Sequence, residues 1–463
     1  MNERQKLFGT AGIRGPYSTK VTAELVINIG QIIADLCKGE GIIVGHDART
    51  SSEALSQSAC SAISLAGGKV YSVGLCTFPV IANLTRDEKH SVAIYITASH
   101  NPPQDNGIKV LRNGREFIQE EQNKIEQKIE ARADQVSLFQ YVSWDKIQAQ
   151  HKISDANETY MKRLVEELDF LGDGRGIILD CANGPMSNLA PQLFSKLGFQ
   201  VTTINSHVDG HFPGRLAEPS PANLGTLLEL CKEKKTMGAA FDGDGDRIAI
   251  IDETGEFVEL SRLNALFATF AIEEEGPGNV IVSIDTSTTI DKTIEKLGAT
   301  TIRTNLGELH GKIKELMERK EKVTFAAEPW KPIFPSWGFW IDGLFALAKL
   351  LKVITKRKTT VYDIMKDIPV HIAERKAYLV KVENILTIFD NCKEKLIERM
   401  KDQDGIELTI DGLRYDLSDG TWILIRKSGT EPKIRIYYES PTMERFKWVE
   451  HIVRELEDIV IVK

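Results

Sequence analysis

Residues 41–47, GIIVGHD, are a short apolar run that ends in an aspartate. Polar residues and a stretch with helical spacing follow as far as residue 65. Two glycines then lead into a second apolar run, KVYSV, at 69–73. Strand, loop, helix, glycine and strand in this order are the pattern of a parallel sheet covered by helices. This stretch therefore predicts one α/β unit.

The same order occurs twice more along the chain. Residues 176–180, GIILD, precede a helical stretch that ends at Gly198, and residues 279–285, NVIVSID, precede one that ends at Gly298. Each helical stretch is followed by a second strand, and each first strand again ends in an aspartate. Three copies with the same aspartate and glycine positions predict three related α/β domains in series.

The C-terminal part has a different order. From about residue 368 the chain shows a strand, a helix over 385–400, an Asp-Gly turn, several short strands and a last helix that begins near residue 442. Such an order predicts a smaller α+β domain. The length of 463 residues fits two to four domains. We therefore expect an α/β chain of four domains, with the boundaries 1–152, 153–255, 256–368 and 369–463.

The composition excludes several classes of protein. The chain has 58 Lys and Arg residues against 66 Asp and Glu, a net charge of −8 that disfavours nucleic acid as a partner. No apolar run approaches the roughly 20 residues of a membrane span, and the polar N-terminal residues do not resemble a secretory signal. Six scattered cysteines without a CxxC pair predict small buried side chains in a reducing compartment. We expect a soluble, cytoplasmic protein.

Three loops could carry chemistry, and the first is residues 95–103, YITASHNPP. An apolar strand leads into it, and Asn-Pro-Pro forces a turn because proline fixes φ and lacks a backbone donor. The turn is expected to leave Ser99 and His100 exposed at a strand end, where α/β sheets place ligands. Beside a histidine and Lys109, Ser99 could be a nucleophile or a phosphoryl carrier. The alternative is a capped turn with an incidental serine. The absence of a Gly-x-Ser-x-Gly motif argues against acyl transfer.

The second loop is residues 239–247, AAFDGDGDR, in which Asp242, Asp244 and Asp246 alternate with glycines between apolar strands. Three such carboxylates repel one another unless a cation lies among them, and hard oxygen ligands suit Mg²⁺ or Ca²⁺. An EF-hand is excluded because Arg247 stands at its sixth position, where that loop needs glycine. A solvated acidic turn is the alternative, but the apolar strands on both sides favour a metal site at a sheet end.

The third loop is residues 423–435, ILIRKSGTEPKIR. Two hydroxyls, a glycine and four cations lie between or at the ends of two apolar runs. Backbone N–H groups at a glycine turn, hydroxyl donors and arginines are the groups that bind phosphate. A plain polar hairpin is the alternative, although it would not need so many cations. The loop therefore predicts a phosphate-binding site.

These three loops, with residues 8–15, FGTAGIRG, and 212–219, FPGRLAEP, closely resemble the motifs of the α-D-phosphohexomutase superfamily. Its members include phosphoglucosamine mutase, phosphomannomutase and phosphoglucomutase. The resemblance runs nearly from end to end and implies four domains around a central cleft. Three would be related α/β domains with mixed sheets covered by helices, and the fourth would be α+β. In this order they would carry a phosphoserine loop, a metal loop, a sugar-specificity loop and a phosphate-binding loop.

The resemblance also implies a mechanism that depends on Mg²⁺. Phosphorylated Ser99 would give its phosphoryl group to a sugar monophosphate, and the resulting sugar 1,6-bisphosphate would return its other phosphoryl group to the serine. Cations gathered at the loops, rather than the net charge, would attract the substrate. The residues implied for catalysis are Ser99, His100, Lys109 and Arg14. Those implied for the metal are Ser99, Asp242, Asp244 and Asp246. Those implied for substrate binding are Arg247, Glu328, Arg426, Ser428, Gly429, Thr430 and Arg435.

One motif departs from the family pattern Gly-Glu-x-Ser-Gly-His. At that place residues 327–335 are AEPWKPIFP, which resembles the loop of archaeal members. Glu328 remains to accept hydrogen bonds from ring hydroxyls, whereas the histidine that often handles a proton there is missing. Trp330 either stacks on a sugar face or packs internally.

We expect glucosamine phosphate to be the substrate. A phosphomannomutase or phosphoglucomutase is the first alternative, and a pentose-phosphate mutase is the next. The altered sugar loop also leaves open a non-catalytic phosphosugar-binding protein. The predicted partner is the phosphosugar, without nucleic acid or membrane, and the predicted state is a monomer or a homodimer.

Overall fold

The computed structural model describes residues 6–9, 12–86, 90–132, 141–428 and 432–461. The chain forms two compact units. The first contains Met1–Val258 and Trp330–Ile364, and the second contains Glu259–Pro329 and Met365–Lys463.

The first sheet contains the first strand–helix–strand repeat and has the order β1-β5-β4-β2-β3-β7, with β6 paired to β5. Its strands β4, β2, β3 and β7 run parallel, whereas β5 is antiparallel to both of its neighbours in that order. The strands are β1 (Ile13–Pro16), β2 (Gly41–His46), β3 (Lys69–Leu75), β4 (Val92–Ile96), β5 (Asp105–Arg112), β6 (Arg115–Glu116) and β7 (Gln150–Lys152). Its helices are α1 (Ala23–Leu36), α2 (Ser52–Leu65), α3 (Phe78–Leu84) and α4 (Gln119–Arg132).

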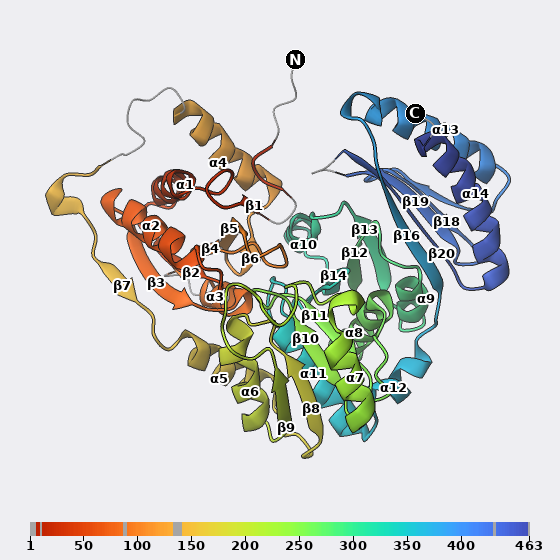
Figure 1. The fold of residues 1–463 in the computed structure, drawn as a ribbon, viewed down its shortest axis with the longest axis horizontal. Coiled ribbons are helices and arrows are strands. Elements are labelled where there is room, and N and C mark those ends of the chain that lie inside the picture. Colours follow the sequence, from red (N-terminus) through yellow and green to blue (C-terminus); the bar gives the residue numbers. More distant parts are fainter. Residues whose placement is uncertain (1–5, 10–11, 87–89, 133–140, 429–431, 462–463) are drawn as a thin grey trace. The chain divides into compact units, whose positions relative to one another are not determined.

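The core of this domain lies between the sheet and helices α1, α2 and α4 (Figure 1). Strand β2 is buried along its whole length, because helices cover a parallel sheet on its faces. Thr22 caps the start of helix α1, and its side chain accepts a hydrogen bond from the N–H of Leu25. Strand β2 ends immediately before Asp47, so the aspartate lies at the carboxyl edge of the sheet.

The second sheet repeats this arrangement with the order β11-β10-β8-β9. Strands β10, β8 and β9 are parallel, and β11 is antiparallel to β10. The strands are β8 (Gly176–Asp180), β9 (Gln200–Ile204), β10 (Gly238–Phe241) and β11 (Ile248–Ile251). The helices of this part are α5 (Ala156–Leu168), α6 (Ala190–Lys196) and α7 (Gly225–Lys234). The first unit also includes β15 (Lys331–Ile333), α11 (Gly343–Arg357) and α12 (Val361–Ile364).

The second unit begins with the third repeat. Strand β12 lies between β13 and β14 and is parallel to both. The elements of this part are α8 (Leu260–Glu275), β12 (Asn279–Ser283), α9 (Thr289–Glu295), β13 (Thr300–Thr304), α10 (Leu309–Glu318) and β14 (Val323–Glu328). The three repeated α/β patterns predicted from the sequence are thus confirmed.

The C-terminal sheet is antiparallel throughout, with the order β16-β20-β19-β18-β17. Its elements are β16 (Ile372–Leu379), α13 (Ile385–Met400), β17 (Gly405–Leu408), β18 (Leu413–Leu417), β19 (Trp422–Lys427), β20 (Lys433–Ser440) and α14 (Met443–Ile461). Helices α13 and α14 lie on one face of the sheet (Figure 1) and share its apolar core. The predicted α+β domain is therefore confirmed, and α13 has the predicted bounds.

Buried polar contacts join the third repeat to the C-terminal sheet within the second unit. Arg414 of β18 is fully buried and donates to the carbonyl oxygens of Ile284 and Thr286, just after β12. Its guanidinium lies 4.0 Å from the ring centre of Trp422. Ile284 and Trp422 belong to one small apolar cluster. These contacts explain why the third repeat and the C-terminal domain form one unit.

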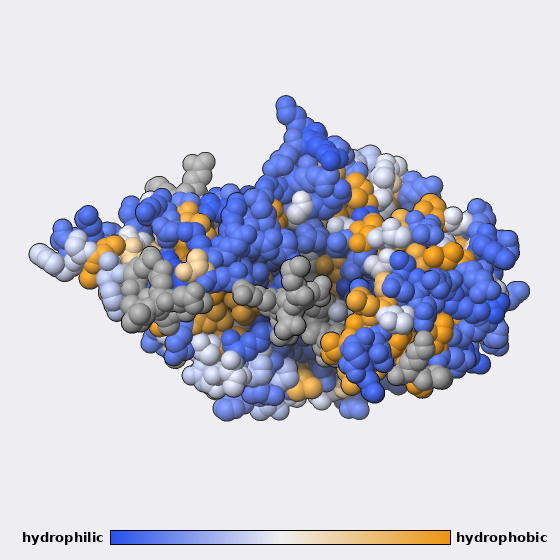
Figure 2. Space-filling model, turned by 90° about the horizontal axis from the view of Figure 1, so that it is seen from above, coloured by the Kyte–Doolittle hydropathy of each residue, from blue (hydrophilic) through white to orange (hydrophobic). Residues whose placement is uncertain are grey.

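The six cysteines are all buried and free of disulfides, as predicted. Burial raises the pKa of the Cys37 thiol to about 11, which keeps it protonated and unreactive. Within the described ranges, none of the helices has the length and apolar character of a membrane-spanning segment. Hydrophobic side chains are interspersed among hydrophilic ones on the face drawn in Figure 2.

Asp342 organises a buried aromatic cluster in the first unit. It caps α11 by accepting from the N–H of Phe345 at 2.9 Å. It also accepts from the indole N–H groups of Trp337 and Trp340, at 2.7 and 3.0 Å, and from the Tyr160 hydroxyl at 2.7 Å. All these ring donors are buried, so they depend on this carboxylate for a partner.

We expect Asp342→Ala to destabilise the protein strongly. The change removes a helix cap and leaves three buried donors without their acceptor, which should cost about 4 kcal/mol. Thermal unfolding followed by circular dichroism measures the effect. Asp145→Ala, at an exposed position, is the control and should leave the midpoint within about 1 °C. An unchanged midpoint for Asp342→Ala would contradict this account.

Candidate functional site

Ser99 lies in the turn that follows β4, in the left-handed backbone conformation with φ of 51°. A serine rarely adopts this conformation unless its surroundings enforce it. Its hydroxyl donates to Asp242 Oδ2 at 2.6 Å. The prediction that Ser99 is exposed is wrong, because the residue is completely buried. The loop after β10 covers it, and a Cβ at Gly243 would lie 2.5 Å from the Ser99 carbonyl oxygen.

Asp242, Asp244 and Asp246 lie between β10 and β11, and all three are buried. Each offers a carboxylate oxygen within 4.8 Å of the others, so the predicted cluster forms. Asp242 Oδ1 accepts from the backbone N–H groups of Gly245 and Arg247, at 3.0 and 3.2 Å. These two bonds fold the loop back on itself.

The electrostatics of the cluster show the cost of grouping like charges. Burial, followed by repulsion from Asp244 and Asp246, raises the pKa of Asp242 well above its usual value. Burial and Asp246 raise the pKa of Asp244 as well. Burial also acts to raise the pKa of Asp246, but Lys109 and Arg247 outweigh it and lower that pKa to about 2. The cluster therefore needs positive charge to stay ionised.

Lys109 supplies part of that charge from β5. Its ammonium group lies 2.7 Å from Asp246 Oδ2, 3.3 Å from Asp244 Oδ2 and 3.6 Å from Glu116 Oε1. It also lies 4.0 Å from the ring centre of Phe78. Burial lowers the pKa of Lys109, but Asp244 and Asp246 outweigh this effect and raise it above its usual value. Lys109 is thus held in its charged form.

His100 lies beside Ser99 and contacts Arg14. The His100 Nδ1 atom is 3.3 Å from the Ser99 hydroxyl and 3.3 Å from Arg14 Nη1. A guanidinium can only donate, so Nδ1 is the unprotonated ring nitrogen in this contact. Burial, followed by the charges of Arg247 and Arg14, lowers the pKa of His100 far below its usual value. The imidazole is therefore neutral.

Arg247 follows the aspartate cluster, and its side chain is largely buried. Its Nη1 is 3.4 Å from Glu218 Oε1 and its Nε is 4.0 Å from Asp242 Oδ2. Segment 212–219 packs on the same loop, because Arg215 donates to Asp180 at 2.8 Å and to the Phe241 carbonyl at 2.6 Å. The structure thus brings together the predicted residues of the first unit: Arg14, Ser99, His100, Lys109, Asp242, Asp244, Asp246 and Arg247.

The aspartate cluster fits a divalent cation. Among the residues that the structure describes, Asp244 Oδ1 and Asp246 Oδ1 are buried without a hydrogen-bond partner. A buried carboxylate oxygen without a partner is costly, and a cation would satisfy it. Three carboxylates with the Ser99 hydroxyl oxygen form a hard donor set of the kind that Mg²⁺ binds.

The predicted phosphate-binding residues lie in the second unit. Arg426 and Arg435 are directly opposite each other on β19 and β20. Arg435 Nη2 is 3.3 Å from the Ser428 hydroxyl, and Arg426 Nη2 pairs with Asp411 at 2.8 Å. Gly429 and Thr430 lie outside the described residues. A pocket of about 370 Å³ is lined by Phe389, Asp411, Gly412, Lys427 and Ser428.

Two residues of the sugar-loop segment have different surroundings. Glu328 is buried at the end of β14, and its Oε1 accepts from the backbone N–H of Gly307. Trp330 packs against Phe257, with ring centres 5.9 Å apart, at the edge of the core of the second α/β domain. Of the two roles considered for Trp330, internal packing is the one observed.

Comparison with known proteins agrees with this geometry. Four domain models of phosphoglucomutase/phosphomannomutase match the chain: domain I over residues 5–136, domain II over 158–255, domain III over 261–371 and the C-terminal domain over 350–456. A phosphopentomutase from Thermococcus kodakarensis is 38% identical, over 98% of this chain and 99% of the relative. The chain belongs to the phosphoglucomutase/phosphomannomutase family.

Other relatives are named as phosphoglucosamine mutases rather than as a phosphopentomutase. A probable phosphoglucosamine mutase from Methanopyrus kandleri is 32% identical, over 98% of this chain and 96% of the relative. The crystal structure of a phosphoglucomutase/phosphomannomutase family protein from Burkholderia thailandensis has the same fold, with a TM-score of 0.85 at 22% identity and 98% coverage of both chains. The Thermococcus and Methanopyrus relatives are both named as phosphosugar mutases, and the chain is therefore a phosphosugar mutase, an intramolecular phosphotransferase of the isomerase class.

Sequence reasoning missed two residues of this mutase's site. Thr97 was part of the first loop but had no role, although its hydroxyl lies 2.7 Å from Asp47 Oδ2 and 3.2 Å from Asp244 Oδ2. Glu116 belongs to none of the motifs, although it faces Lys109. The signal for Thr97 was its position at the end of a strand. Glu116 had no signal, because only the pairing of β5 with β6 brings it close.

Proposed function

We propose that this mutase moves a phosphoryl group between two oxygens of one sugar through a phosphoserine at Ser99. In the first step the bond between phosphorus and Ser99 Oγ breaks, and a bond to a sugar hydroxyl oxygen forms. The hydroxyl proton passes to a base, Ser99 Oγ takes up a proton as it leaves, and the product is a sugar bisphosphate. In the second step Ser99 Oγ gives up this proton as it accepts the other phosphoryl group, and the former sugar oxygen of that group regains a proton. The observation that carries this proposal is the Ser99 hydroxyl, 2.6 Å from a carboxylate of the aspartate cluster.

The cofactor we propose is Mg²⁺, held by Asp242, Asp244, Asp246 and an oxygen of phosphorylated Ser99. When bound, it supplies positive charge that offsets the charge on the transferring phosphoryl group. Lys109, held charged by Asp244 and Asp246, adds to that positive charge. We assign Arg14 and Arg247 to contacts with phosphoryl oxygens, because a guanidinium donates two parallel hydrogen bonds to such a group.

Proton transfer falls to His100 and Lys109. We assign the role of proton acceptor to His100, because its unprotonated Nδ1 lies 3.3 Å from Ser99 Oγ, the oxygen that gives up a proton in the second step. Lys109 is charged and can donate one. We therefore assign one proton acceptor and one proton donor to these two side chains.

The phosphate that does not react is assigned to the C-terminal domain. Arg426 and Arg435 would bind its oxygens, with the Ser428 hydroxyl and the backbone of Gly429 and Thr430. Holding the remote phosphate lets its binding energy position the reacting end of the sugar. Glu328 would accept hydrogen bonds from ring hydroxyls.

Glucosamine phosphate is the substrate we propose first. The relative from Methanopyrus kandleri, named a probable phosphoglucosamine mutase, supports it. A pentose phosphate is the second candidate. Two observations favour it: the 38% identical relative is named a phosphopentomutase, and the loop after Glu328 departs from the hexose pattern.

A panel of substrates tests the proposed function. Purified protein with Mg²⁺ and a sugar 1,6-bisphosphate activator is assayed on glucosamine 6-phosphate, glucose 6-phosphate, mannose 6-phosphate and ribose 5-phosphate. We expect the highest kcat/KM with glucosamine 6-phosphate, whereas a higher value with ribose 5-phosphate would establish the second candidate. Binding of these sugars without turnover of any of them would contradict the mutase mechanism and support a binding protein.

A further inference from the structure

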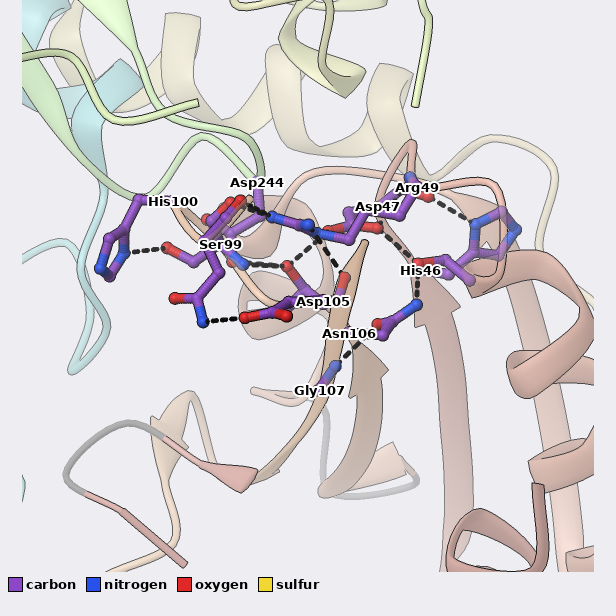
Figure 3. A network of polar contacts seen from close by, with 12 residues as sticks. His46, Asp47, Arg49, Ser99, His100, Asp105, Asn106, Gly107 and Asp244 are labelled. Carbon is purple, nitrogen blue, oxygen red and sulfur yellow. Dashed lines mark hydrogen bonds and ion pairs between the residues drawn. The ribbon is translucent and has the colours of Figure 1, made fainter. Parts of the chain in front are cut away.

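Arg49 has no role in the mechanism above, and its side chain contacts the backbone of the Ser99 turn. It follows the strand-terminal Asp47, and its side chain is fully buried. We propose that Arg49 is a positioning residue that holds Ser99 in place for phosphoryl transfer. This proposal rests on the proposed function of Ser99. Figure 3 shows Arg49 and Asp47 within the polar network that includes Ser99.

The guanidinium of Arg49 holds four backbone carbonyl groups of the turn. Its Nη2 donates to the carbonyl oxygens of Ser99 and Asn101, at 2.8 and 2.7 Å. Its Nη1 donates to those of Asp105, at 2.9 Å, and Pro102. Four carbonyl dipoles that converge on one point repel one another, and a buried cation with several donors relieves this repulsion. Only the planar fork of an arginine offers donors in so many fixed directions.

Asp47 binds both the Arg49 guanidinium and Thr97, which holds the backbone N–H of Ser99. Its Oδ2 accepts from Arg49 Nε at 3.1 Å and from the Thr97 hydroxyl at 2.7 Å. The Thr97 oxygen in turn accepts from the backbone N–H of Ser99 at 2.8 Å. Both the N–H and the carbonyl of Ser99 are therefore held by the Asp47–Arg49 pair, one through Thr97 and one directly. This double attachment accounts for the left-handed conformation of Ser99.

Arg49 also contacts the part of the chain that carries the metal loop. Its guanidinium lies 5.1 Å from the ring centre of Phe212. Gly210 approaches so closely that a Cβ there would lie 2.4 Å from the Ala48 carbonyl oxygen. A Cβ at Gly243 would lie 3.4 Å from the Phe212 ring and 2.5 Å from the Ser99 carbonyl oxygen. The distance from Ser99 to the aspartate cluster thus depends on packing around Arg49.

Loss of this guanidinium should change the rate of transfer more than substrate binding. Arg49 is buried under the turn and touches backbone carbonyls, so it does not contact the sugar. A displacement of Ser99 by about 1 Å should slow transfer about 100-fold. The KM should stay within about threefold, because the proposed phosphate and sugar contacts are unchanged.

The test uses the full-length protein with Arg49→Met, Arg49→Lys and Asp47→Asn. Phosphorylated enzyme is mixed with excess sugar phosphate, and loss of phosphate from Ser99 is followed in a single turnover, with steady-state kcat and KM measured alongside. We expect about 100-fold slower transfer for Arg49→Met and a smaller loss for Arg49→Lys, which keeps the charge but not the fork. Arg175→Met is the matched control, since Arg175 also donates to a carboxylate and to the backbone carbonyl of Thr359 but lies at the start of β8.

Thermal unfolding of each variant separates positioning from folding. The proposal is upheld if Arg49→Lys slows transfer while its thermal unfolding midpoint falls no further than that of Arg175→Met. The transfer rate of Arg175→Met should stay within about twofold of wild type. It is overturned if Arg49→Lys and Asp47→Asn transfer phosphate at the wild-type rate. If Arg49→Met does not fold, these two conservative variants decide the question. A wild-type protein that turns over no sugar phosphate would instead contradict the proposed function.

Discussion

The Ser99→Ala variant is expected to lose mutase activity almost completely, with kcat lowered about 10,000-fold or more. The change removes the only oxygen at this position that can carry the phosphoryl group between the two sugar oxygens. The methyl group that remains fits the backbone turn, because Arg49 and Thr97 hold the main chain of residue 99 and not its side chain. The variant should therefore fold and bind substrate. Coupled turnover assays and isothermal titration with the sugar phosphate measure the two properties separately.

Ser58→Ala is the matched control for this prediction. Ser58 lies on α2, and its hydroxyl donates to the Ala54 carbonyl one turn earlier. We expect this variant to keep the wild-type kcat. If Ser99→Ala kept more than about a tenth of the wild-type kcat, the phosphoserine mechanism would be wrong, and direct transfer between substrate molecules would have to replace it.

The second large effect is expected for Asp244→Asn. With one of three carboxylates neutral, the cluster binds Mg²⁺ more weakly, and kcat should fall about 100- to 1,000-fold because less charge is offset during transfer. Stability without metal should not fall. Burial and Asp246 raise the pKa of Asp244, so its ionised form is strained, and an amide removes that strain. Lys109 keeps its 2.7 Å partner, Asp246.

Thermal unfolding with and without Mg²⁺ measures this prediction. Saturation of the wild-type protein at 100 times its Kd should add about 2.7 kcal/mol of stability, and this gain should largely disappear in the variant. Asp145→Asn, at an exposed position, should show the full gain. Turnover that persists in excess chelator, or an equal Mg²⁺ response in Asp244→Asn, would contradict the metal assignment.

Much of the fold was predictable because local patterns determine it. The run GIIVGHD and its two counterparts predicted the positions of β2, β8 and β12, each of which ends within two residues of an aspartate. The alternation of aspartate and glycine predicted the cluster of Asp242, Asp244 and Asp246, since neighbouring positions in a chain are always close in space. The domain boundaries stay a prediction.

The rest depends on contacts between distant parts of the chain. Ser99 was expected to be exposed, and it is buried because Gly243, far along the sequence, packs on its carbonyl. Arg49 had no signal in the sequence, because its carbonyl partners begin 50 residues later. The packing of Trp330 depends on Phe257, which lies far from it in the sequence. Such tertiary packing follows no local periodicity.

The central claim is that Ser99 carries the phosphoryl group that reaches the sugar. Its most direct test is to phosphorylate the enzyme with a sugar 1,6-bisphosphate, add excess sugar 6-phosphate, and follow tryptic peptide 90–109 by fragmentation mass spectrometry. We predict phosphate on Ser99 alone, lost at the rate at which new bisphosphate appears in the first turnover. Phosphate on another residue, or phosphate that stays on Ser99 while the sugar turns over, would contradict the claim.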